Sequence, residues 1–176
     1  MTTVADVGFV EMRLGKVVGV ATAEGEASYF VVLDGVSEDR HLPIQIGQTE
    51  AFNLSATLTR MEFARPMSPQ FAVGLLHALG GRVRQVRIDR LVPAFGGGTA
   101  YGSTVEVESA TGVELVDARP SDALNLVALA PAPILAAPEV LADAEAQAEG
   151  DSPEASLLRR ALECEQMTVR QGPPDR

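Results

Sequence analysis

Charged and polar side chains crowd a short stretch near residue 120. Asp117, Arg119, Ser121 and Asp122 lie there, between an apolar strand and the expected start of a helix. Pro120 suits the first position of that helix, because the N–H group that proline lacks has no helical partner there. The carboxylate of Asp122 then lies where the positive end of the helix dipole favours it. This spacing predicts a strand-to-helix corner that presents carboxylates beside a guanidinium.

A weaker version of the same pattern occurs 72 residues earlier, in residues 44–54. The matched pairs are Thr49 and Ser121, Glu50 and Asp122, Ala51 and Ala123, Asn53 and Asn125, and Leu54 and Leu126. The repeated order of residue types predicts an internal duplication. A duplicated chain would bring the two corners together around a pseudo-two-fold axis.

Hydrolysis of phosphodiester bonds is a reaction that these groups could perform. It needs a base or a metal ion to activate the attacking group, and positive charge to stabilise the phosphate oxygens. The predicted catalytic and metal-binding carboxylates are Glu50, Asp117 and Asp122, with Mg²⁺ or Mn²⁺ as the expected ion. The predicted phosphate-binding residues are Arg65, Arg119 and Ser121.

The same residues also fit a structural role. Asp122 and Glu50 could simply cap helices, and Arg119 could pair with Asp117 to hold the corner in place. Ion-pair networks of this kind resemble active sites, so the pattern leaves both roles open. A non-catalytic anion-binding or ligand-binding regulatory module, or an oligomeric scaffold, is the alternative function.

Composition limits the classes of function. The 176 residues carry a net charge of −10, which disfavours a nucleic-acid-binding protein with a broad basic surface. The single cysteine, Cys164, and two distant histidines, His41 and His77, cannot form a zinc site of soft ligands. The glycines at 96–98 lack the pattern of a nucleotide-binding loop, so no organic cofactor is expected. No long apolar run or signal peptide occurs, which predicts a cytoplasmic protein without a membrane partner.

The spacing of apolar residues predicts an α+β fold, with duplicated strand–strand–helix units and a mixed, mostly antiparallel sheet flanked by helices. Residues 1–149 should form the domain, and residues 150–176 a C-terminal helix whose last residues, 171–176, are disordered. Uncovered edge strands and the amphipathic C-terminal helix make a homo-oligomer plausible.

One further helix is expected between Ser68 and the glycines at 80 and 81. Its predicted buried stripe is Phe71, Leu75, Ala78 and Leu79. His77 falls on the opposite side of this helix, which predicts a solvated side chain.

The chain resembles the bifunctional nuclease family, small α+β domains of bacteria and plants. The matching segments are Leu42-Pro43-Ile44, Ile46-Gly47, Glu50-Ala51, Arg65-Pro66-Met67, Asp117-Ala118-Arg119-Pro120-Ser121-Asp122-Ala123 and Ala132-Pro133-Ile134, within about residues 28–145. The resemblance implies RNase and DNase activity, with RNA or DNA as substrate. This chain departs from the family after Arg-Pro-Met, where Ser68, Pro69 and Gln70 replace the usual Thr, His and Asp. It therefore lacks an acid–base pair that the family pattern would place there.

Overall fold

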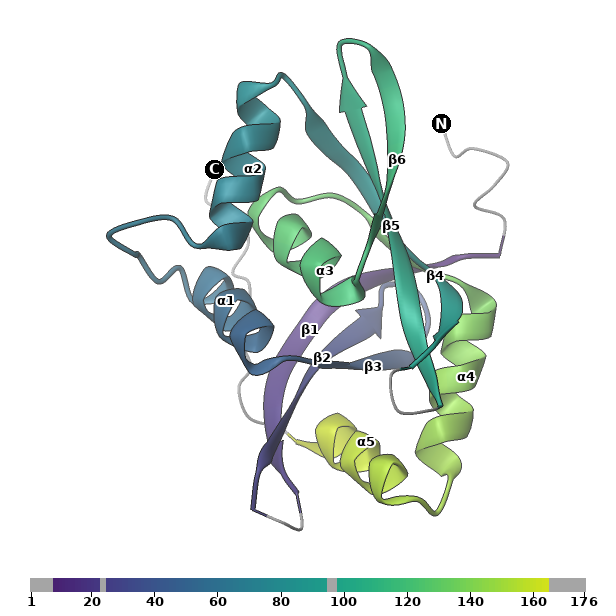
Figure 1. The fold of residues 1–176 in the computed structure, drawn as a ribbon. Coiled ribbons are helices and arrows are strands. Elements are labelled where there is room, and N and C mark those ends of the chain that lie inside the picture. The colour runs from purple at the N-terminus through teal and green to yellow at the C-terminus, as the bar shows by residue number, and fades with distance from the viewer. Residues whose placement is uncertain (1–7, 23–24, 95–97, 165–176) are drawn as a thin grey trace.

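The computed structural model describes residues 8–22, 25–94 and 98–164, which form one sheet with helices packed around it (Figure 1). Along the chain the elements are β1 (Val10–Ala21), β2 (Ala27–Gly35), β3 (His41–Ile46), α1 (Gln48–Leu58), α2 (Ser68–Ala78), β4 (Arg82–Pro93), β5 (Thr99–Ser109), β6 (Gly112–Ala118), α3 (Pro120–Leu129), β7 (Ile134–Ala136), α4 (Pro138–Glu149) and α5 (Pro153–Glu163). The predicted disordered tail, residues 171–176, lies outside the described ranges. None of the helices in those ranges has the length and apolar character needed to cross a bilayer.

The order of strands in the sheet is β3-β2-β1-β7-β4-β5-β6. The short central strand β7 runs antiparallel to β1 and parallel to β4, and the other strand pairs are antiparallel. The predicted α+β class with a mixed, mostly antiparallel sheet is therefore confirmed. β1 and β4 lie on either side of β7 and run in opposite directions. A pseudo-two-fold axis near β7 would relate two halves of the sheet in this way.

The elements on either side of β7 recur with a constant offset. β1 spans residues 10–21 and β4 spans 82–93, so both of their ends are 72 residues apart. The same offset separates the starts of β2 and β5, the ends of β3 and β6, and the starts of α1 and α3. The predicted duplication is thus confirmed at the level of whole elements. Each unit has three antiparallel strands before its helix, one strand more than the predicted strand–strand–helix unit.

Alternation along the strands separates the two faces of the sheet. In β4, Val86 and Ile88 are fully buried and contribute to the main core, whereas Arg87 between them projects to the other face. The main core also includes Leu54 of α1 and Leu124 of α3, both fully buried. The two helices therefore pack over the core from equivalent positions in their units.

The C-terminal helix α5 covers the outer face of the first unit. Ala161 of this helix is fully buried in a second, smaller cluster with Phe30 of β2. Lys16 of β1 donates from Nζ to the backbone carbonyls of Leu162 and Cys164, both at 2.6 Å. These bonds satisfy carbonyls at the end of the helix and fasten it to the sheet of its own chain.

The prediction for the buried face of α2 is wrong. The side chains expected inside are exposed, with Phe71 at 62%, Leu75 at 51% and Leu79 at 75% of full exposure, and Val73 is buried in their place. Among the elements that the structure describes, the helix packs mainly on α3, on the side that carries Val73. His77 is exposed, as predicted.

Candidate functional site

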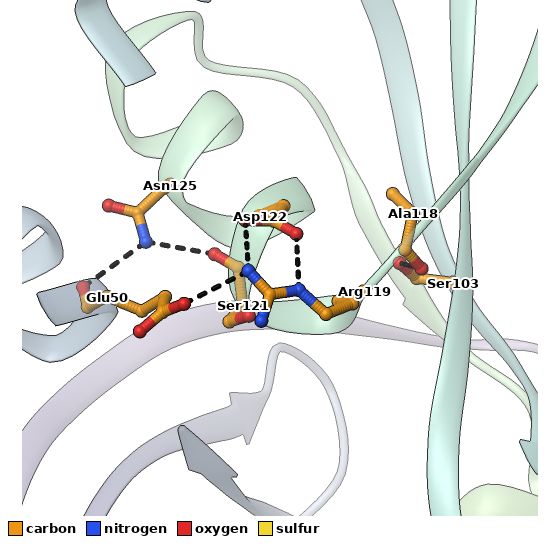
Figure 2. A network of polar contacts seen from close by, with 7 residues as sticks. All are labelled: Glu50, Ser103, Ala118, Arg119, Ser121, Asp122 and Asn125. Atoms are coloured by element: carbon orange, nitrogen blue, oxygen red, sulfur yellow. Dashed lines mark hydrogen bonds and ion pairs between the residues drawn. The ribbon is translucent and has the colours of Figure 1, made fainter. Parts of the chain in front are cut away.

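The corner predicted near residue 120 forms where β6 ends and α3 begins. Ala118 closes the strand, and the buried Ser103 of β5 donates its hydroxyl to the Ala118 carbonyl at 2.8 Å (Figure 2). Arg119 follows as the residue before the helix, in an extended backbone conformation, and Pro120 begins α3. The backbone at Arg119 is therefore held on one side by the sheet and on the other by the helix.

The guanidinium of Arg119 joins the carboxylates of both units. Its Nε donates to Oδ2 of Asp122 at 2.7 Å, and its Nη2 donates to Oδ1 of Asp122 and to Oε1 of Glu50, each at 3.0 Å (Figure 2). Hydrogen bonding to Asp122, and then the negative charge of Asp122, raise the pKa of Arg119 above its usual range. The guanidinium accordingly remains charged at any physiological pH.

The duplication explains why two acids meet one arginine. Glu50 and Asp122 occupy the third position of α1 and α3, and they are equivalent under the 72-residue offset. The equivalent of Arg119 in the first unit is Gly47, which precedes α1. A Cβ atom at Gly47 would lie 2.3 Å from Oε2 of Glu50, so the missing side chain leaves room for this carboxylate. The second unit thus contributes the arginine, and the glycine of the first unit leaves room for the Glu50 carboxylate that the arginine binds.

A buried asparagine links the two helices beneath the ion pairs. Asn125 is 2% exposed, and its Nδ2 donates to the carbonyl of Ser121 at 2.9 Å and to the carbonyl of Glu50 at 3.3 Å. Ser121 is itself buried. The sequence predicts that the Ser121 side chain supports phosphate binding. The hydrogen bond that the structure shows at Ser121 is the one that its backbone carbonyl accepts from Asn125. Asn125 therefore positions the Glu50 backbone against α3.

Asp117 lies apart from Glu50 and Asp122. Asp117 pairs with Thr104 of β5, and Thr104 pairs with Arg87 of β4. The side chains of these three residues project from one face of the sheet. The neighbouring residues Ala118 and Ser103 project from the opposite face, toward the core. Arg90 of β4 forms an ion pair with Asp117, and both residues line an open groove of about 510 Å³ on the face that carries Asp117. The side-chain alternation of β6 thus separates two acids that lie close together in sequence.

The three carboxylates do not form the expected site for Mg²⁺ or Mn²⁺. Within residues 8–22, 25–94 and 98–164, no group of three or more His, Cys, Asp or Glu side chains is arranged to hold a metal ion. Glu50 and Asp122 form ion pairs with Arg119 instead, and Asp117 faces the other way. A single ion shared by these three residues does not fit this arrangement.

Arg65 lies outside the network as well. It is exposed in the loop between α1 and α2, and it forms no hydrogen bond or ion pair with another residue in the described ranges. Sequence reasoning also missed two features of the site. The first is the difference between Gly47 and Arg119, which the 72-residue repeat aligns and which was therefore visible in the sequence. The second is the ion pair of Asp117 with Arg90, which depends on strand pairing that no local motif indicates.

The corner offers two groups for chemistry. The side chain of Arg119 is 67% exposed, and its Nη1 donates to no residue that the structure describes. The side chain of Glu50 is 22% exposed, and its Oε2 likewise accepts no hydrogen bond from the described part of the chain. A charged donor and a carboxylate oxygen are therefore available together, which suits recognition of a phosphate or another anion and transfer of a proton beside it.

Comparison with known proteins identifies relatives. A family model described as a bifunctional nuclease domain matches residues 31–149, a range that contains both helices of the corner. Two uncharacterized proteins of Mycobacterium tuberculosis, one from strain CDC 1551 / Oshkosh and one from strain ATCC 25618 / H37Rv, are each 31% identical to this chain over 129 residues. These alignments cover 73% of this chain and 74% of each relative.

Proposed function

Because the chain belongs to the bifunctional nuclease domain family, as the resemblance predicted, we propose that it hydrolyses phosphodiester bonds of RNA or DNA at the corner where Arg119 joins Glu50 and Asp122. The observation that supports this proposal is the arrangement of Arg119. Two carboxylates hold its guanidinium by three hydrogen bonds, while Nη1 is left to meet a substrate. A preorganised cation of this kind stabilises negative charge that develops on a phosphate.

Each residue of the corner has a role in the proposed reaction. Nη1 of Arg119 binds a non-bridging phosphate oxygen, and Oε2 of Glu50 accepts a proton from the attacking water. The water oxygen forms the new bond to phosphorus as the bond to one ester oxygen breaks, and the departing alkoxide takes a proton from solvent. Asp122 positions the guanidinium by its two hydrogen bonds to Arg119.

Substrate contact is expected to be local. The arginines of β4 do not form an open basic track, because Arg82 is paired with Glu108, Arg84 with Glu106 and Arg90 with Asp117. With a net charge of −10, the protein gains little from long-range attraction to a polyanion. The proposed site therefore engages one phosphate group closely, and Arg65 remains a candidate for a second phosphate contact from its loop.

A non-catalytic module that binds an anionic ligand is the second candidate. It is favoured by the engagement of both acids with Arg119 in the free protein, because that engagement gives each carboxylate a structural role. In that case the ion pairs serve to orient Arg119, and no bond in the ligand is broken.

Cleavage assays on labelled single-stranded RNA and DNA distinguish the two functions. We expect the wild type to cleave at least one of them, and Arg119→Ala to reduce the rate about 100-fold or more, because it removes the phosphate-binding cation. Arg13→Ala is the matched control, since Arg13 is an exposed arginine of β1 far from the corner in sequence. Parallel reactions with a chelator, Mg²⁺ or Mn²⁺ test the metal dependence predicted from the sequence. Full activity in Arg119→Ala would overturn the proposal by placing catalysis elsewhere in the molecule. Activity that separates from the protein on purification would overturn it in favour of ligand binding.

A further inference from the structure

Two phenylalanine side chains form an aromatic pair on the helix that carries Glu50. Phe52 belongs to α1, and Phe63 belongs to the loop of residues 59–67, which joins α1 to α2 and projects away from the sheet (Figure 1). Their ring centroids lie 5.9 Å apart, and the rings are tilted by 57°. We call these two residues the aromatic platform. Phe52 is 49% exposed, so roughly half of its surface stays open although Phe63 packs against it.

The platform lies near the proposed site along α1. Phe52 follows Glu50 by two residues, so the two side chains leave the same turn of the helix about 200° apart. A strand with one phosphate at Arg119 therefore reaches Phe52 by passing over the first turn of α1, a path of about 10–12 Å, the diameter of a helix. At a rise of roughly 3.4 Å per nucleotide, about three or four nucleotides cover this path.

The loop beside the platform carries two unpaired arginines. The side chains of Arg60 and Arg65 are exposed and form no hydrogen bond or ion pair with any other described residue. Most other arginines in the described ranges are engaged: Arg40, Arg82, Arg84, Arg90 and Arg119 with carboxylates, and Arg159 and Arg160 with backbone carbonyls. With one acid, Glu62, the loop carries a local positive charge in a protein whose net charge is −10. Cationic groups beside an exposed aromatic ring are the combination that binds the backbone and the bases of a single strand.

We propose that the aromatic platform stacks on an unpaired base of a single-stranded nucleic acid whose phosphate lies at Arg119. The inference rests on the proposed function, because it takes the bound phosphate as its starting point. It names the substrate class, since the bases of a duplex are stacked on one another and are not open to Phe52. Every base has an aromatic face, so the platform selects single strands without selecting a sequence. Stacking also supplies affinity that the net charge of the protein does not.

A tryptophan in place of Phe52 reports this stacking directly. The chain contains no tryptophan, so the emission of Phe52→Trp comes from this position alone. We expect a single-stranded oligonucleotide of about eight nucleotides to quench that emission by about half, and a strand of the same length with abasic sites throughout to leave it unchanged. The titrations use a Glu50→Gln background, which keeps Arg119 and prevents cleavage. Leu115→Trp in the same background is the control, because Leu115 is an exposed residue of β6 whose emission should not respond.

The affinity of a leucine variant separates stacking from packing within the protein. Phe52→Leu keeps an apolar side chain against Phe63 but removes the aromatic face. By fluorescence anisotropy of the labelled strand in the Glu50→Gln background, we expect this variant to bind about 5- to 150-fold more weakly than its parent. The abasic strand should bind both proteins equally, and a duplex should bind no better than the abasic strand. Leu115→Ala is the matched control and should keep the affinity of the parent.

The outcomes separate this inference from the proposed hydrolysis. Emission of Phe52→Trp that the intact strand does not change would overturn the inference, as would a Phe52→Leu variant that binds that strand as tightly as its parent. The aromatic platform would then only hold the loop against α1, and cleavage by the wild type would show that hydrolysis proceeds without it. Quenching by the intact strand together with a wild type that cleaves nothing would support the inference and overturn the proposed hydrolysis.

Discussion

At the scale of single residues, the corner depends on a difference between two equivalent positions. Arg119 and Gly47 precede equivalent helices, and only the pairing of an arginine with an unfilled space lets one guanidinium reach both Asp122 and Glu50. A strictly symmetric pair of arginines would place a side chain where Oε2 of Glu50 now lies. The duplicated chain has therefore diverged at the position that brings one guanidinium to both carboxylates.

Substitution of Gly47 tests this dependence. Gly47→Ala should reduce cleavage roughly 10- to 100-fold, because the new methyl group displaces the Glu50 carboxylate from its place beside Arg119. The effect on stability should be small, about 0.5 kcal/mol, since the backbone at Gly47 has a φ of −70° that alanine also adopts. Gly19→Ala is the control, because the added Cβ would meet Tyr29 at an ordinary 3.4 Å. Unchanged activity in Gly47→Ala would show that the position of Glu50 is unimportant.

Much of the corner could be predicted at this scale, but not all of it. The polar residues between Asp117 and Asp122 and their weaker copy at Glu50 located the corner and its partner helix. Local sequence could not show that Asp117 projects to the opposite face, because that depends on which residue ends β6. Nor could it show that Arg90 approaches from β4, since contacts between strands depend on register.

At the scale of elements, most strands and helices followed from the spacing of apolar residues. The edge position of β3 agrees with Pro43, which lacks a donor for a further strand. The error at α2 has a physical cause. Helical periodicity shows which side of a helix is apolar, but it does not show whether that side is covered by the same chain or by another. The spacing of Phe71, Leu75 and Leu79 correctly indicated an apolar side of the helix, but that side is exposed in the structure.

Tyr101 connects β5 to α4 and gives stability a dependence on pH. Burial, and then the charge of Asp143 and the hydrogen bond to it, raise the pKa of Tyr101 above its usual range. The folded state therefore binds the phenolic proton of Tyr101 more tightly than the unfolded state does. This contribution to the free energy of unfolding is complete below about pH 10, the pKa in the unfolded state, and is lost as the pH rises further.

Urea unfolding of Tyr101→Phe tests this connection. At pH 8 the variant should be less stable than the wild type by about 1 kcal/mol, the usual contribution of one hydrogen bond. Between pH 10 and 11 the gap should narrow, because the wild type alone loses the contribution of this proton. Tyr29→Phe, at the equivalent position of the first unit, controls for loss of a tyrosine hydroxyl. A gap that stays constant with pH would contradict the assignment to Asp143.

At the scale of the whole molecule, the duplication organises the fold and the site together. Two units of three strands and a helix flank β7, and the pseudo-two-fold relation places the start of α1 beside the start of α3. The sequence showed this repeat most clearly at the corners, where polar residues recur in order. The repeat is hard to recognise in the strands, because different apolar residues can replace one another in the core at little cost in stability.

The two units differ in what covers them. α5 packs on the outer face of β1 and β2, whereas the equivalent face of β4, β5 and β6 presents the groove lined by Arg90 and Asp117. The repeat alone could not predict this asymmetry, because α5 belongs to neither unit. The molecule thus combines a symmetric framework with three unsymmetrical features: the Arg119 corner, the exposed apolar side chains of α2 and the cover supplied by α5.

The most direct test of the central claim is the kcat of Glu50→Gln on one labelled oligonucleotide, measured beside the exposed control Glu114→Gln. Glutamine keeps the size of the side chain and an oxygen that can accept from Arg119, so unfolding free energy should change by no more than about 1 kcal/mol. It removes the proposed base, and kcat should fall by about 100- to 10,000-fold, while the control retains the wild-type rate. A Glu50→Gln enzyme that cleaves at the wild-type rate would contradict the claim that this corner is the catalytic centre.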